Sequence, residues 1–169
     1  MKTEKGKVVS VSLYDAAVSS LVNQASNYLM NKHIPQRIGS LHPNIAPYGE
    51  LFKTADGKLI TFAIGSQTHF EKLVLELDLK ELLTDSRFIN NQSRVENRKA
   101  LAEVLQTKIT SRNAEELLNK LHLQFVPCAE IKNLKDVFKN PESRDLVREE
   151  VIDGKITKRV TSIAFKYEN

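Results

Sequence analysis

The sequence predicts an α+β fold in which an antiparallel hairpin packs with several helices. The hairpin is the clearest feature. Two short apolar runs, residues 51–54 and 59–64, are joined by a segment with Asp56-Gly57, a pair that suits the positive φ angles of a tight turn. The helices are indicated by apolar residues at intervals of three and four before and after the hairpin. These two patterns together give the fold class.

The first elements expected are a short strand and a long helix. Residues 8–12 alternate valine and serine, which is typical of a strand. Ser12 is placed to cap a helix over residues 13–29, where leucine or alanine recurs at every fourth position, and Asp15 completes a capping box. The prolines and glycines of residues 32–49 then break the helical period. We therefore expect a long loop there.

Further helices and strands follow the hairpin. Helices are expected from near Ser66 or Thr68, at about 91–109, 113–122 and 134–138, and from Asn140-Pro141; strands are expected at 125–129 and in a terminal hairpin of 150–152 and 156–165 around Asp153-Gly154. Because Pro127 has no N–H to donate to a neighbouring strand, the strand at 125–129 is expected at a sheet edge.

The core is expected where the second strand of the hairpin faces the helices. On the strand, the inward residues are Ile60, Phe62 and Ile64. On the helices, the inward residues are Phe70, Leu73, Val74, Leu77, Val95, Leu101, Val104, Leu105, Leu117, Leu118 and Leu121.

Composition and charge exclude several function classes. The chain has 169 residues, a net charge of +4, one cysteine and no tryptophan. A single cysteine cannot form an internal disulfide, and no Cys or His cluster has zinc-site spacing. Basic residues alternate with acidic ones, as on solvated helix faces, so nucleic-acid binding is not expected. No apolar run approaches the roughly 20 residues of a membrane span and no signal peptide is recognised, so we expect a cytoplasmic protein without membrane contact.

Two sets of side chains could be reactive, but a structural role is favoured for each. Cys128 with His122 or His69 is a candidate nucleophile and base, but a lone cysteine in an apolar strand is more often buried and inert. His33 and His42 flank the proline-rich loop, where no third ligand stands at metal spacing, so exposed loop histidines are the favoured interpretation.

The turn at residues 65–68 lies between a strand and a helix, where backbone N–H groups can face an anion. It lacks the second glycine and the lysine of a P-loop, which favours an ordinary strand-to-helix turn. No pair of carboxylates stands out. The residues taken alone therefore predict a fold class and an unusual loop, and assign no chemistry.

Six segments in a fixed order resemble one enzyme family. They are residues 5–16, residues 39–57 with His-Pro-Asn-Ile-Ala-Pro-Tyr at 42–48, residues 63–70, residues 85–98 with Asn91, Arg94 and Asn97-Arg98, residues 126–129, and residues 136–141. The chain is similar in these segments to the C-terminal half of class III CoA-transferases, the CaiB/BaiF family that also contains 2-methylacyl-CoA racemases. Ser10 and Ser86 depart from the pattern, since the family often has aspartate and proline there.

The resemblance implies an enzyme that moves CoA between carboxylic acids, with an aspartate that takes up the acyl group as a mixed anhydride. In the family, this aspartate and most contacts to CoA belong to an N-terminal Rossmann-like domain. No aspartate of this chain matches the nucleophile's motif, so we assign no catalytic residue, no metal and no cofactor, with CoA as a substrate. Asp15 needs only a capping role.

The resemblance also implies a division of the chain. Residues 1–34 correspond to a strand and long linker helix of the large domain, 35–140 to the small domain, and 141–169 to a return segment with the terminal hairpin. In the family, the small domain covers the active site of an interlocked dimer through a loop that bears on the acyl group. That loop corresponds to residues 39–47 and is named the covering loop here. The resemblance implies that it covers the substrate with Gly39, Ser40, His42, Pro43, Asn44 and Pro47.

Three functions remain open at this point. The chain is expected to be part of a CoA-transferase, inactive alone, with acyl-CoA and a carboxylic acid as its ligands. The alternatives are part of a racemase-like enzyme, which His and Asp acid/base residues upstream would favour, and a non-catalytic binding module. In each case we expect self-association or pairing with a separate N-terminal half.

Overall fold

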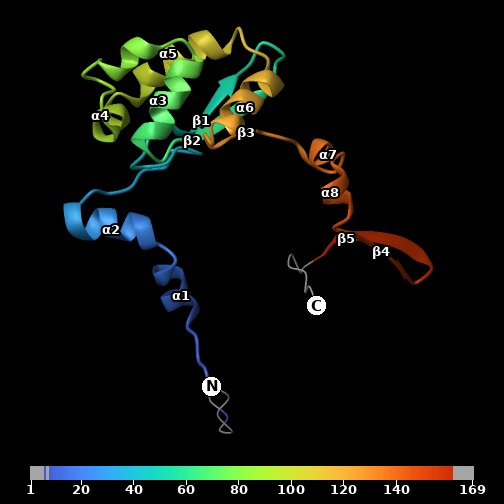
Figure 1. Cartoon of the computed structure of the whole chain (residues 1–169). Coiled ribbons are helices and arrows are strands. Elements are labelled where there is room, and N and C mark those ends of the chain that lie inside the picture. The colour runs from blue at the N-terminus through green and yellow to red at the C-terminus, as the bar shows by residue number, and fades with distance from the viewer. Residues whose placement is uncertain (1–5, 7, 162–169) are drawn as a thin grey trace. The chain divides into compact units, whose positions relative to one another are not determined.

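The computed structural model describes residues 6 and 8–161, and the chain divides into two units, residues 1–39 and 40–169. The first unit contains the helices α1 (Leu13–Ser19) and α2 (Val22–Asn31) (Figure 1). Ser12 caps α1 as predicted, because its Oγ accepts a hydrogen bond from the Asp15 amide at 3.3 Å.

Two predictions for the first unit are wrong. Residues 8–12 form no strand, because no described segment pairs with them. The helix predicted over 13–29 is interrupted at residues 20–21. At the break, Ser19 and Ser20 donate their hydroxyls to the carbonyls of Asp15 and Ala17, at 2.5 and 2.7 Å. Serine hydroxyls that bond back to the helix backbone favour bends and breaks, and this explains the second difference.

The second unit begins with an antiparallel sheet in the order β1 (Tyr48–Lys53), β2 (Leu59–Ala63) and β3 (Cys128–Glu130). The predicted hairpin is confirmed as β1–β2, with Gly57 at φ +77° in its turn. β3 is an edge strand as predicted, but it starts three residues later than expected. Residues 125–126 instead close the preceding helix, since both of their amides donate to its last carbonyls.

The remaining elements follow the predicted order, with one short helix, η1 (Lys80–Leu83), that was not predicted. They are α3 (Gln67–Glu76), the 3₁₀ helix η1 (Lys80–Leu83), α4 (Asn91–Glu96), α5 (Arg98–Ile109), α6 (Ala114–Leu123), α7 (Leu134–Val137), α8 (Pro141–Arg144), β4 (Val147–Ile152) and β5 (Lys155–Val160). The predicted helix 91–109 is two helices, because Asn97 leaves helical geometry and its Nδ2 donates to the Ser93 carbonyl at 2.9 Å. The terminal hairpin is confirmed up to β5; residues 162–165 of the prediction lie outside the described part.

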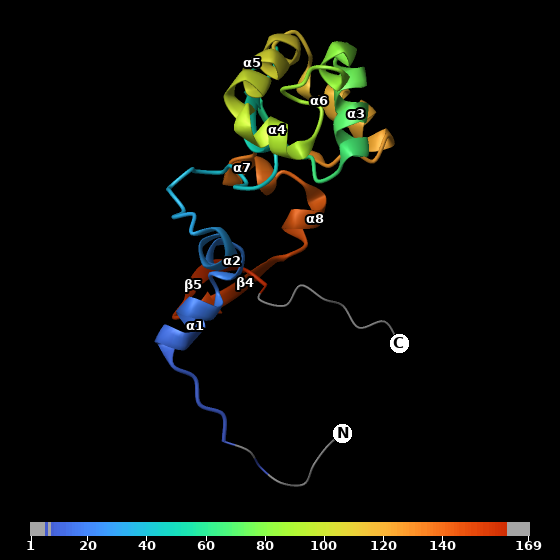
Figure 2. The same ribbon diagram turned by 90° about the vertical axis from the view of Figure 1, so that its left-hand side faces the viewer.

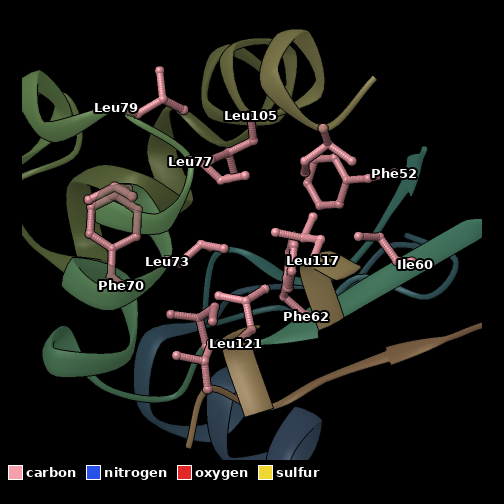
Figure 3. Close-up of a cluster of buried hydrophobic side chains, with 14 of the residues drawn as sticks. Phe52, Ile60, Phe62, Phe70, Leu73, Leu77, Leu79, Leu105, Leu117 and Leu121 are labelled. Atoms are coloured by element: carbon pink, nitrogen blue, oxygen red, sulfur yellow. The ribbon is translucent and has the colours of Figure 1, made fainter. Parts of the chain in front are cut away.

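The core of the second unit lies between the sheet and the helices. In both views α3, α4, α5 and α6 gather beside the three-stranded sheet (Figure 1, Figure 2). Phe62 of β2 packs against Phe52 of β1, with ring centroids 5.3 Å apart, and the leucines of α3, α5 and α6 close over them (Figure 3). The predicted inward residues are buried, except that Val104 and Val95 are only partly buried.

Many large apolar side chains outside this core are exposed. No residue of α1, α2, β4 or β5 is buried, and Leu13 is 90% exposed. Among the described residues, no helix has the length and apolar character that crossing a membrane requires.

Candidate functional site

Where the covering loop leads into β1, the backbone at residues 40–42 lies close to the backbone at residues 48–49. The Ser40 hydroxyl donates to the Gly49 carbonyl at 2.7 Å, and the His42 amide donates to the Tyr48 carbonyl at 2.9 Å. Gly49 has φ +90°, and a Cβ there would lie 2.0 Å from the Ser40 carbonyl oxygen. Only glycine satisfies both conditions. The loop is thereby closed on itself where it meets the sheet.

Arg98, at the start of α5, holds two carbonyls of the covering loop. Its Nη2 donates to the carbonyls of His42 and Ile45, at 2.5 and 2.8 Å. Its Nη1 donates to Oε1 of Glu50 in β1 at 3.1 Å, and Glu50 is only 6% exposed. A guanidinium presents its donors in a fixed plane. Arg98 therefore fixes the loop relative to β1 with one rigid group.

Arg94, one turn earlier in α4, is 2% exposed and holds a third carbonyl. Its Nε donates to the Ala46 carbonyl at 3.0 Å, and its Nη1 donates to the Phe88 carbonyl and to Oε1 of Gln67. The guanidinium also lies over the Phe70 ring, 4.2 Å from the centroid. Burial lowers the pKa of Arg94. This residue is thus a buried cation surrounded by neutral oxygen atoms and an aromatic face.

Asn91 completes the attachment of the loop. Its Nδ2 donates to the Asn44 carbonyl at 2.8 Å, while its Oδ1 accepts from the Ala46 amide at 3.3 Å. Asn91, Arg94 and Arg98, here named the clamp residues, bind four carbonyls between residues 42 and 46. Buried backbone oxygens need such partners. In this loop, side chains therefore supply the hydrogen bonds that a strand or helix would otherwise give to the backbone carbonyls.

The structure brings most of the predicted loop residues together. His42, Pro43 and Asn44 lie within the segment that the clamp residues bind, and Ser40 and Pro47 flank it, while Gly39, at φ +69°, belongs to the first unit. The alanine–proline bond before Pro47 is cis. The His42 Nδ1 accepts from the Asn44 amide at 3.1 Å, and its ring lies beside Tyr48. His42 therefore shapes the loop.

Sequence reasoning assigned no role to the clamp residues. The signal was present, because all three belong to the family pattern at residues 85–98. A charged side chain in an amphipathic helix is ordinarily a solvated one, and nothing local indicated that Arg94 points into the protein.

The alternative candidates do not form reactive groups. The Nε2 of His122 lies 2.9 Å from the Cys128 carbonyl oxygen, so it bonds the backbone. Burial raises the pKa of the Cys128 thiol to about 11, which disfavours the thiolate that a nucleophile needs. Within residues 6 and 8–161, no three His, Cys, Asp or Glu side chains are grouped so as to hold a metal ion. Ser66 caps α3 by accepting from the His69 amide at 3.2 Å.

Comparison with known proteins gives consistent matches. The model of CoA-transferase family III matches residues 1–168. The chain is 32% identical to the succinate–glutarate CoA-transferase of Agrobacterium fabrum, over 84% of this chain and 35% of that protein. It is 37% identical to the human succinyl-CoA:glutarate CoA-transferase, over 83% of this chain and 32% of that one.

A solved structure extends the match to the fold. A CaiB/BaiF family protein from Brucella suis superimposes with a TM-score of 0.69 and 36% identity, over 91% of this chain and 40% of that one. The chain spans about a third of the length of the curated relatives it matches.

Proposed function

Because the chain belongs to CoA-transferase family III, we propose that it supplies the acid-covering part of an enzyme that moves CoA between carboxylic acids. The proposal is carried by one observation: three side chains bind four carbonyls of the covering loop. Such a loop presents its outer face in one geometry, and geometric placement of substrate is a large part of the rate in group transfer.

The acids proposed are short dicarboxylic acids. The relatives cited above are named for succinate or succinyl-CoA and glutarate, and another, from Chloroflexus aurantiacus, is a succinyl-CoA–D-citramalate CoA-transferase. Succinyl-CoA is thus the proposed donor, with CoA a substrate rather than a bound cofactor. These names favour transfer over the racemase alternative.

The role proposed for this chain is positioning. Asn44 is exposed in the covering loop, whereas Ala46 and Pro47 are buried. We assign contact with the acid to His42, Pro43 and Asn44, and support of that contact to the clamp residues. Chemistry at the thioester requires a positioned carboxylate and hydrogen-bond donors for the developing oxyanion. We propose that both come from a part of the enzyme equivalent to the two thirds of the relatives that this chain does not match. Dimer formation and a cytoplasmic location stay predictions from the sequence.

The test is an assay with succinyl-CoA and glutarate. The 169-residue chain alone is expected to give no glutaryl-CoA, whereas a mixture with the N-terminal two thirds of the Agrobacterium enzyme is expected to turn over. In that mixture, Asn44→Ala is expected to change the KM for glutarate more than the KM for succinyl-CoA. Turnover by the chain alone would contradict the proposal, as would equal changes in both KM values.

A further inference from the structure

A cavity of about 330 Å³ opens beside the clamp, between the start of α3 and the start of α4. Its polar wall is formed by Gln67, Asn90, Asn91 and Arg94, and its apolar wall by Ile64 and Ile89. Among the described residues, no Asp or Glu lines it, and the Arg94 guanidinium is the only ionised group in its wall.

Arg94 has no counter-ion in the described chain. Its three hydrogen bonds end on the neutral oxygens of Ala46, Phe88 and Gln67. Burial of an ion costs several kcal/mol unless a partner of opposite charge compensates for it. The lowered pKa of this side chain has burial as its cause. A buried guanidinium of this kind favours an anion beside it.

One amino group of Arg94 remains available for such an anion. Nε and Nη1 are bonded to protein oxygens, and Nη2 has no hydrogen-bond partner among residues 6 and 8–161. The described side-chain atoms that are both enclosed and unpaired are Oε2 of Glu50, Oγ1 of Thr61 and Nδ1 of His69. Nη2 is not among these enclosed atoms, and Arg94 is one of the residues that line the cavity.

Resting on the proposed function for the class of ligand, we propose that this cavity binds one carboxylate of a small organic acid, with Nη2 of Arg94 as the charged donor. A second donor is Nδ2 of Asn90, which has no described partner because only Oδ1 of that side chain is bonded, by the Ser93 amide at 2.9 Å. Ile64 and Ile89 suit the hydrocarbon part of the acid. A carboxylic acid with a hydrocarbon chain can use both the guanidinium and this apolar wall, whereas inorganic phosphate can use only the guanidinium. Two of the residues that line the site, Asn91 and Arg94, are clamp residues that also bind carbonyls of the covering loop.

Gln67→Glu tests the proposal on the isolated chain. Gln67 is exposed and its Oε1 lies 2.9 Å from Arg94 Nη1, so the new carboxylate neutralises the guanidinium in place and leaves the packing unchanged. Binding of glutarate is followed by titration calorimetry and by amide NMR shifts of Gly65 and Asn91. We expect the variant to weaken glutarate binding by at least about tenfold. Its melting temperature is expected to be no lower than that of the wild type, because the buried guanidinium gains a counter-ion.

Thr68→Glu is the matched control. It adds the same charge to the same exposed turn of α3, but Thr68 does not line the cavity. It is expected to change the affinity for glutarate by less than about threefold, as for a solvent-screened charge. Inorganic phosphate is titrated in parallel, and weaker binding of phosphate than of glutarate is expected.

Three results would overturn the proposal: no glutarate binding to the wild-type chain, equal weakening by both variants, or tighter binding of phosphate than of glutarate. None of them depends on transfer activity. Failure of this site and failure of the proposed function are therefore distinguishable, because the binding experiment uses the chain alone and the transfer assay uses the mixture.

Discussion

Helices α1–α2 and helices α3–α6 both have apolar residues at helical spacing, yet only the second group has a core. Leu73 of α3 is fully buried, whereas Leu13 of α1 is 90% exposed and no residue of α1 or α2 is buried. The difference lies in what surrounds the helices: α3–α6 pack on a sheet and on one another. The spacing of apolar residues therefore specifies which face of a helix is apolar. Other elements must pack on that face to bury it and so stabilise the helix.

The largest effect is expected from Phe62→Ala. Phe62 is 2% exposed and packs on Phe52 in the centre of the core. Truncation removes buried apolar surface and leaves a cavity, which costs about 3–5 kcal/mol for a buried phenylalanine. Urea unfolding followed by circular dichroism measures the loss. Leu13→Ala is the control and is expected to change the free energy of unfolding by less than about 0.5 kcal/mol. Equal losses for the two variants would contradict the division between the regions.

The next largest effect is expected from Arg98→Ala. The substitution releases two carbonyls of the covering loop and leaves the buried Glu50 carboxylate without its cation. Removing one partner of such a pair costs about 3 kcal/mol. Hydrogen exchange at the His42 amide, which donates to the Tyr48 carbonyl in β1, is expected to accelerate.

A second substitution separates the two causes of that loss. Glu50→Gln in the Arg98→Ala background removes the unpaired charge and is expected to recover more than half of the lost free energy of unfolding. The exchange at His42 is expected to stay fast, because the released carbonyls are still unbound. If the double variant were no more stable than Arg98→Ala, the loss would not come from the unpaired Glu50 carboxylate, and this prediction would be contradicted.

The same comparison explains which predictions succeeded. The β1–β2 turn follows from Asp56-Gly57, and the inward leucines of α6 follow from their spacing, because local geometry and tertiary burial agree there. The predictions of a strand at 8–12 and of an unbroken helix at 13–29 were wrong. In this region no buried core stabilises one local backbone conformation over another. The clamp was missed because Arg94 becomes a buried group only when residues 42–46, almost fifty positions away, reach it.

A smaller effect, visible only in acid, is expected at Asp56 in the hairpin turn. Its Oδ1 accepts from the Thr54 hydroxyl at 2.6 Å and from the Ala114 amide at 3.1 Å, and these bonds hold the pKa of Asp56 below its usual range, with the Thr54 bond the larger cause. The unfolded chain therefore binds this proton more tightly than the folded chain. The contribution of Asp56 is fully present above the ordinary carboxyl pKa of about 4 and is lost as the pH falls through the lowered value.

Asp56→Asn removes this pH dependence. The free energy of unfolding, measured in urea at several values from about pH 6 to about pH 2.5, is expected to fall less steeply in the variant than in the wild type. Asp145→Asn, at an exposed position in the turn after α8, is the control and is expected to leave the wild-type profile unchanged. Parallel profiles for Asp56→Asn and the wild type would contradict the assignment.

The smallest effect on stability, and the sharpest on assembly, is expected from Leu21→Ser with Leu29→Ser. Both leucines are more than half exposed, at 54% and 64%, so their loss is expected to change the free energy of unfolding by less than about 0.5 kcal/mol. Large exposed apolar surface is typical of an interface, and we predict that the chain self-associates through residues 8–34. Sedimentation velocity at micromolar concentration is expected to give a dimer or larger species for the wild type and a monomer for the double variant. A monomeric wild type would contradict this prediction, and the apolar face of α1 and α2 would then need a different partner chain for its burial.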